Sequence, residues 1–229
     1  MKIGITKFPG TNNEQDVARI LYSLNLEYEY IFPNDVDNLE ETEALILAGG
    51  FSYGDYLRPG VIASHSPIAK ELYHYINSDR YIIGICNGFQ ILCELGILPG
   101  ILTTNTSTKF ICKWVNIRTE QTFSNLLSGL DDNKIKIPIA HYEGRYFDIP
   151  KHILELEKTK RIAFRYCNEE KEITEESNPN GSIGNIAGIL NSKGNVLGMM
   201  PHPERASFAY LGSKDGRFIF ENLKKVLRC

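Results

Sequence analysis

Residues 81–90 read Tyr81-Ile82-Ile83-Gly84-Ile85-Cys86-Asn87-Gly88-Phe89-Gln90. The first five form the short apolar run of a buried strand, and from Phe89 onward the apolar residues follow a helical spacing that Gly96 can end. A strand that passes at once into a helix is the repeating unit of α/β folds. The stretch therefore predicts a mostly parallel sheet with helices on both faces.

The rest of the first half repeats this alternation of apolar runs and helical patterns. Further strands are predicted at residues 3–5 and 44–48. One helix is expected to begin at Asn12 or Asn13, because Asn is a good N-cap residue. A second helix is predicted from Ser66-Pro67, because proline is favoured at an early helical position.

The second half carries more strand patterns than helical ones. Five strands are predicted near residues 111–117, 134–140, 161–166, 185–190 and 196–200. The polar segment 168–184 is predicted to be an exposed loop. A final helix is predicted to place Phe218, Phe220, Leu223 and Val226 on or near one face.

Length and composition set the class of protein. The 229 residues are enough for one α/β domain, and no linker divides them, so a single domain over residues 1–229 is predicted. The formal net charge is −3 and no basic stripe occurs, which predicts no nucleic acid and no membrane as partner. Residues 1–5 already resemble a strand, so no signal peptide is predicted. Five cysteines without paired spacing indicate free thiols, no metal motif and a cytoplasmic protein.

Cys86 lies where the strand ends and the helix begins, between Gly84 and Gly88. This is the elbow of G-x-S-x-G hydrolases with Cys in place of Ser. A helix N-terminus favours a thiolate, and the Asn87 N–H points toward a place where an oxyanion could form. Cys86 is therefore a candidate nucleophile, with a buried structural cysteine as the alternative. The cysteines without such a setting are Cys93, Cys112, Cys167 and Cys229.

A thiolate nucleophile needs a histidine base, and the base needs an acceptor that orients it. Two His-x-Glu motifs occur, His141-Tyr142-Glu143 and His202-Pro203-Glu204. In extended chain, residues i and i+2 point to the same side, so either Glu could bond to its His. The prolines around His202 favour the second motif modestly, and the choice between the two stays open on spacing alone.

The turn Ala48-Gly49-Gly50-Phe51 follows another predicted strand. Paired glycines let backbone N–H groups approach a ligand closely, so Gly50 could supply a second oxyanion donor beside Asn87. A plain loop is the alternative.

Nucleotide-binding motifs are absent from the sequence. Neither G-x-x-x-x-G-K-[ST] nor a G-x-G-x-x-G after a strand occurs. An energy-using step is therefore expected on another chain.

Together these motifs resemble the class I, or triad, glutamine amidotransferases. The motifs that carry this resemblance are Gly49-Gly50, the elbow at 84–90 and Pro201-His202-Pro203-Glu204. Further runs at 8–12, 50–58, 143–146, 178–182 and 198–205 resemble one family within that class. It comprises the glutaminase subunits of phosphoribosylformylglycinamidine synthases, which act in purine biosynthesis. The resemblance spans nearly the whole chain.

The resemblance implies a flavodoxin-like fold and a Cys-His-Glu triad. Cys86 would attack the side-chain amide of L-glutamine, His202 would transfer protons, and Glu204 would orient His202. Gly50 and Asn87 would hold the oxyanion.

The resemblance also implies the residues that hold glutamine. These would be Phe51, Gln90, His141, Glu143 and Gly144, which assigns the other His-x-Glu motif to substrate binding. Ammonia would pass to a synthetase subunit, with a small third subunit bridging the two. This chain would carry no cofactor, and ATP and Mg²⁺ would be used by the synthetase.

Two rival functions share some of these features. A γ-glutamyl hydrolase, or a glutaminase for another synthetase, would share the triad but would not explain the 51–58 run. A non-catalytic binding subunit of the same fold would not require an intact triad.

Overall fold

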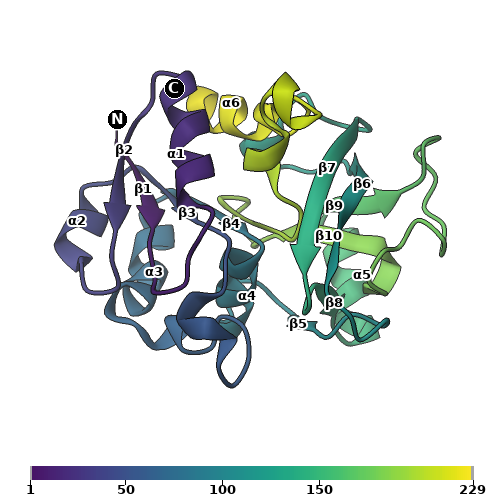
Figure 1. Ribbon diagram of the computed structural model, residues 1–229, viewed down its shortest axis with the longest axis horizontal. Helices are drawn as coiled ribbons and strands as arrows, with labels where there is room; N and C mark the ends of the chain where they lie inside the picture. Colours follow the sequence, from purple (N-terminus) through teal and green to yellow (C-terminus); the bar gives the residue numbers. More distant parts are fainter. Residues whose placement is uncertain (1, 228–229) are drawn as a thin grey trace.

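The computed structural model describes residues 2–227, and its centre is a nine-stranded sheet (Figure 1). The strand order is β2-β1-β3-β4-β11-β10-β9-β6-β7. The strands are β1 (Lys2–Thr6), β2 (Glu27–Ile31), β3 (Ala44–Leu47), β4 (Tyr81–Ile85), β6 (Ile111–Thr119), β7 (Lys134–His141), β9 (Ile162–Cys167), β10 (Ile186–Leu190) and β11 (Val196–Met199). A second sheet pairs β5 (Ile101–Thr103) with β8 (Arg145–Phe147).

The five strands from β2 to β11 run parallel to one another. Strands β3 and β11 are buried along their whole length, as expected for strands that are covered on both faces. The order β2-β1-β3-β4, continued by β11, is the flavodoxin-like order of open α/β sheets. The α/β fold predicted from the elbow stretch is confirmed.

The remaining four strands, β10, β9, β6 and β7, pair antiparallel, so the sheet is mixed. Strand β7 is last in this order, yet it returns to the parallel half. The Pro138 carbonyl in β7 accepts a hydrogen bond of 2.9 Å from the N–H of His202, which follows β11. The antiparallel half therefore closes over the carboxyl ends of the parallel strands.

Helices cover both faces of the sheet, with α1 and α6 on one face and α3 and α4 on the other (Figure 1). The helices are α1 (Glu14–Ser23), α2 (Val36–Glu40), α3 (Pro67–Asn77), α4 (Asn87–Glu94), α5 (Pro150–Lys158) and α6 (Arg217–Val226). Ser66 caps α3 as expected, since its hydroxyl accepts the Ala69 N–H. In α6, however, Ile219, Phe220 and Leu223 are buried, whereas Phe218 is 49% exposed, so the predicted apolar face was wrong at Phe218.

The polar segment 168–184 is not exposed throughout, contrary to the prediction. Asn180 and Ser182 are buried. The Asn180 side-chain amide donates to the Gly144 carbonyl at 2.8 Å, and the Ser182 hydroxyl accepts the Tyr146 N–H at 3.0 Å. Polar side chains of this segment thus provide hydrogen-bond partners for buried backbone groups of residues 144–146.

One hydrophobic core cluster runs through the sheet and both helical layers. Its largest fully buried side chains include Tyr146, Tyr166 and Phe89. No helix within residues 2–227 is long and apolar enough to cross a membrane. Cys229, considered above as a thiol without a catalytic setting, lies outside the described residues.

Candidate active site

Loops that follow four neighbouring parallel strands meet at the carboxyl edge of the sheet. Asn13 lies in the connection after β1, Gly50 after β3, Cys86 after β4 and His202 after β11. All four line one cavity of about 130 Å³. Ligands of open α/β sheets bind at this edge. The fold thus gathers, at one point, residues from both ends of the chain.

Cys86 occupies the sharp turn between β4 and α4. Its backbone has φ +51° and ψ −104°, which lies outside the usual regions for a residue with a side chain. The turn is tight because Gly84 and Gly88 allow it: a Cβ at Gly88 would lie 2.1 Å from the Leu47 carbonyl oxygen. The Sγ atom lies 3.7 Å from the Ala140 carbonyl oxygen, so β7 contacts the thiol directly.

His202 and Glu204 form a buried hydrogen-bonded pair. His202 Nδ1 lies 2.7 Å from Glu204 Oε1, and both side chains are almost fully buried. Because a carboxylate only accepts, Nδ1 carries the proton and donates. Glu204 lies in a short 3₁₀ turn (Pro203–Ala206) rather than in extended chain, so the bond forms for a different geometric reason than expected. His202 Nε2 is buried and makes no hydrogen bond of ordinary geometry within the described residues, but the ring lies close enough to Cys86 for that thiol to raise the pKa of the imidazole.

Burial and neighbouring charges shift the pKa of His202 in opposite directions. Burial by itself lowers its pKa, but the negative charges of Glu204 and Cys86 outweigh burial and raise the pKa above the ordinary value for histidine. The pair thus favours a protonated imidazole beside Cys86, as a group that hands a proton to a leaving atom requires.

Two backbone N–H groups at the ends of neighbouring elements have no acceptor in the described part of the chain. In the turn after β3, hydrogen bonds use the Gly49 carbonyl and the Phe51 N–H, and no acceptor within residues 2–227 takes up the Gly50 N–H. Gly50 has φ +143°, a conformation that L side chains rarely adopt. The Asn87 N–H opens α4, where no helical acceptor exists.

A second cavity, of about 250 Å³, adjoins Cys86. Its lining residues are Gly50, Phe51, Asp55, Pro59, Cys86, Gln90, Ala140, His141, Tyr142 and Glu143. Four of the five residues expected to hold substrate lie on this wall. Gly144 instead lies behind His141, with its N–H donated to Asn105 Oδ1 at 3.2 Å.

The Nδ1 atom of His141 has a different partner from that of His202. Its Nδ1 bonds to Asn105 Oδ1 at 3.1 Å rather than to Glu143, and within the described residues its Nε2 has no partner. Burial, reinforced by the positive charge of His202, lowers the pKa of His141 to about 4. His141 is therefore neutral at physiological pH, and its Nε2 is a buried acceptor on the cavity wall.

Asp55 is a wall residue that the sequence analysis missed. Its Oδ1 is buried and, within the described residues, unpartnered. Burial and the charge of Glu143 raise the pKa of Asp55 to about 6. Among the described residues that line this cavity, two are carboxylates and none is cationic. Asp55 lies within the 51–58 run that carried the family resemblance, but no motif spacing in that run singled out Asp55 as a site residue.

Asn12 or Asn13 was expected to cap the first helix, and Asn13 does occupy the N-cap position, but its side chain bonds elsewhere. No side-chain cap bond forms at the start of α1. Instead, Nδ2 donates to Glu204 Oε1 at 3.0 Å and lies 3.3 Å from His202 Nδ1.

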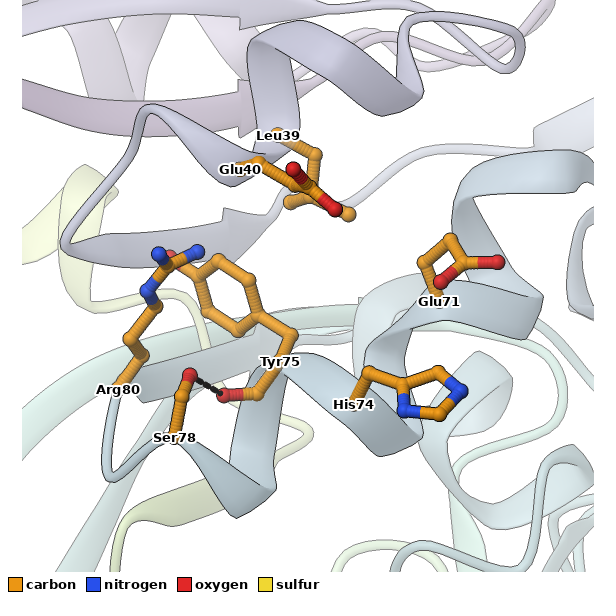
Figure 2. A pocket seen from close by; sticks show the side chains of 7 residues that line it. All are labelled: Leu39, Glu40, Glu71, His74, Tyr75, Ser78 and Arg80. Atoms are coloured by element: carbon orange, nitrogen blue, oxygen red, sulfur yellow. Dashed lines mark hydrogen bonds between the residues drawn. The ribbon is translucent and has the colours of Figure 1, made fainter.

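A separate hollow of about 300 Å³ lies between α2 and α3 (Figure 2). Arg80 stacks on the Tyr75 ring at 5.0 Å, and the Ser78 hydroxyl donates to the Tyr75 carbonyl. His74 and Glu71 line it from α3, and Figure 2 draws no bond between them. None of the described residues that line this hollow is a cysteine, whereas Cys86 lines both of the other cavities.

Comparison with known proteins gives a consistent result. Residues 1–217 match the family of CobB/CobQ-like glutamine amidotransferase domains. The phosphoribosylformylglycinamidine synthase subunit PurQ of Aquifex aeolicus is 46% identical over 225 residues, which cover 97% of this chain and 99% of that protein. The corresponding subunit of Koribacter versatilis is 46% identical, with 97% of each chain covered.

Solved structures agree with the sequence relatives. A chain of the PurLQS structure from Thermotoga maritima superposes with a TM-score of 0.86 at 39% identity and covers 99% of this chain and 98% of that chain. A glutamine amidotransferase from the same organism has a TM-score of 0.57 at 14% identity, with 100% of this chain and 84% of that chain covered, and shares the fold.

Proposed function

The chain belongs to the CobB/CobQ-like glutamine amidotransferase family, and from that premise we propose that Cys86, His202 and Glu204 are its catalytic triad. The chain is the glutaminase subunit of a phosphoribosylformylglycinamidine synthase and acts in purine biosynthesis. Its partners are the synthetase and a small third subunit.

One observation carries the assignment of the triad. The bond from His202 Nδ1 to Glu204 fixes the ring, and Nε2 is left facing the cavity that Cys86 also lines. This matches the nucleophile, base and orienting acceptor of triad hydrolases. The His141 motif lacks the bond to its own Glu, which favours His202 as the catalytic histidine.

The proposed reaction has two steps. The Cys86 thiolate attacks the side-chain amide carbon of glutamine, and the carbonyl electrons move to oxygen. His202 Nε2–H then protonates the amide nitrogen, the C–N bond breaks, and ammonia leaves a thioester. Water attacks the thioester, His202 takes a proton from that water, and glutamate is released.

The Gly50 and Asn87 N–H groups are proposed to stabilise the oxyanion of both steps. Both groups reach the site edge without a competing acceptor in the described part of the chain. Removing one such donor typically lowers kcat roughly 10²–10³-fold.

The 250 Å³ cavity is proposed to hold the rest of the glutamine molecule. Phe51, Gln90, His141 and Glu143 lie on its wall, and Gly144 supports His141 from behind. Asp55 and Glu143 place two carboxylates on the wall, and the nearby Arg58 does not line the cavity, which suits the α-ammonium group of an L-amino acid.

We also propose the domain organisation, cofactor use and localisation of the chain. Residues 1–229 act as a single glutamine amidotransferase domain without a cofactor, and ATP and Mg²⁺ belong to the synthetase subunit. The chain works in the cytoplasm, where a thiol such as that of Cys86 stays reduced.

An affinity label tests the assignment of the nucleophile. A diazoketone analogue of L-glutamine should alkylate Cys86 with one label per chain, and excess L-glutamine should protect it. Cys112 is the internal control because its thiol is exposed and free. Labelling of Cys112 in preference to Cys86, or labelling that glutamine does not slow, would overturn the assignment.

A further inference from the structure

Asn13 joins the two halves of the active site. Its backbone N–H and that of Asn12 donate to the Gly49 carbonyl at 3.2 and 3.3 Å. Its side chain, 2% exposed, reaches Glu204 at the other end of the chain. One residue therefore contacts both the turn that carries Gly50 and the carboxylate that orients His202.

The carboxylate of Glu204 depends on very few contacts. Oε1 accepts from His202 Nδ1 at 2.7 Å and from Asn13 Nδ2 at 3.0 Å. Oε2 is buried and has no partner within residues 2–227. Without Asn13, the His202 bond alone would fix a buried charged group, and the carboxylate could rotate about it.

The fit around Asn13 is close. A Cβ at Gly49 would lie 3.0 Å from His202 Cε1 and 3.4 Å from Asn13 Cγ. The Gly49 turn thus lies close to both the amide and the imidazole. The amide is also neutral, so it adds a donor without pairing with Glu204 as a cation would.

We propose that Asn13 is a positioning residue that holds the Glu204 carboxylate in the orientation that His202 requires. The inference rests on the triad proposed above. A hydrogen bond to a charged group contributes about 1.5–3 kcal/mol, which corresponds to roughly 10–100-fold in rate if the bond is needed in the transition state.

The test uses Asn13→Leu and Asn13→Asp in the complex reconstituted with the synthetase. Leu has a similar size but no donor, and Asp has the same shape but a negative charge at high pH. Both variants should lower kcat of glutamine-dependent synthesis by about 10–100-fold, with the KM for glutamine within about twofold of wild type. Ammonia-dependent synthesis should be unchanged, and Asn38→Leu, at an exposed position in α2, is the matched control.

The pH dependence separates positioning from packing. The carboxyl group that Asn13→Asp introduces can donate to Glu204 when it is protonated, and two neighbouring carboxylates hold such a proton to higher pH. The kcat of Asn13→Asp relative to wild type should therefore rise as pH falls from 9 to 6, while that of Asn13→Leu stays low. Asn13→Ser, a shorter donor, should recover part of the rate.

Two results would overturn the proposal. One is a wild-type kcat for Asn13→Leu, and the other is identical pH profiles for the Leu and Asp variants. If His202→Ala keeps full glutamine-dependent activity, the triad itself is wrong, so the two failures are distinguishable. If Asn13→Leu does not assemble, Asn13→Asp and Asn13→Ser carry the same comparison.

Discussion

Gln90 and Glu143 are joined by a hydrogen bond of 2.7 Å from the Gln90 side-chain amide to the Glu143 carbonyl oxygen. Gln90 lies in the helix that follows Cys86, and Glu143 lies in the loop that follows β7. The same Gln90 side chain accepts from Asn87 Nδ2 at 3.0 Å. This hydrogen bond thus connects the 141–143 side of the proposed substrate cavity to α4, the helix that follows Cys86.

Removing the hydrogen bond between Gln90 and Glu143 should weaken glutamine binding. Gln90→Leu is expected to raise the KM for glutamine about fivefold, because a net hydrogen bond of about 1 kcal/mol holds the wall. Steady-state kinetics of the complex measure it, with Gln121→Leu, an exposed position, as control. An unchanged KM would mean that the loop holds its shape without Gln90.

Replacing the nucleophile should separate the two activities of the complex. Cys86→Ala should abolish glutamine-dependent synthesis and leave ammonia-dependent synthesis intact, because ammonia enters after the thioester steps. Product formation with each nitrogen source is the measurement. Loss of both activities in a complex that still assembles would contradict the assigned role.

The two histidines should differ kinetically. His202→Ala should lower kcat, because proton transfer by a placed base contributes roughly 10²–10⁴-fold. His141→Ala should mainly raise the KM for glutamine, since His141 is a neutral acceptor on the cavity wall. With a pKa of about 4, His141 should add no titration to the KM between pH 6 and 9. The reverse kinetic pattern would exchange the roles.

Asp55 should select for the α-amino group of the substrate. In wild type, the preference for L-glutamine over its analogue without that amino group should fall as pH drops from 8 to 5. Asp55, with a pKa of about 6, is charged above this value and neutral below it. The ratio of kcat/KM values cancels the titration of catalytic groups.

A matched pair of variants completes that test. Asp55→Asn should reduce the preference about tenfold at pH 8 and make it less dependent on pH, with Glu143 and Arg58 as the remaining charges nearby. Asp37→Asn, at an exposed position in α2, should change neither. A preference that stays at the wild-type value in Asp55→Asn would place the ammonium elsewhere.

Binding of the synthetase should increase the rate at which this chain hydrolyses glutamine. Glycine at position 50 tolerates more than one backbone conformation, so the Gly49–Gly50 peptide is a candidate switch, although turning the Gly50 N–H away from the site would also break the two hydrogen bonds that the Gly49 carbonyl accepts from Asn12 and Asn13. Losing that donor costs roughly 10²–10³ in kcat, so the chain alone should hydrolyse glutamine far more slowly than the complex with all synthetase ligands. Equal rates of hydrolysis would exclude this switch.

The sequence predicted the parallel half of the fold because its strands are apolar runs. It missed β2, an edge strand in which charged and aromatic side chains alternate (Glu27, Tyr28, Glu29), so that no apolar run marks it. The error at residues 168–184 has a similar cause. Polarity indicates exposure only when water, rather than other protein groups, satisfies the hydrogen bonds.

Within the site, neighbours along the chain were easier to predict than distant ones. His202 and Glu204 are two residues apart, so a bond between them was a candidate, but the equally spaced His141 and Glu143 form none. Asn13 and Glu204 are 191 residues apart, and only the folded sheet brings them together. Local rules assigned Asn13 to the helix that it precedes, and the tertiary contact overrides that preference.

The backbone at Cys86 has a consequence for how this chain can change over evolution. A residue with a side chain held at φ +51° and ψ −104° costs on the order of 1–3 kcal/mol, which glycine would largely avoid. Selection for thermal stability alone would therefore favour replacing Cys86 by glycine, and selection for activity would oppose this if Cys86 is the nucleophile proposed above. At this position, fitness as a folded protein and fitness as an enzyme are in direct conflict.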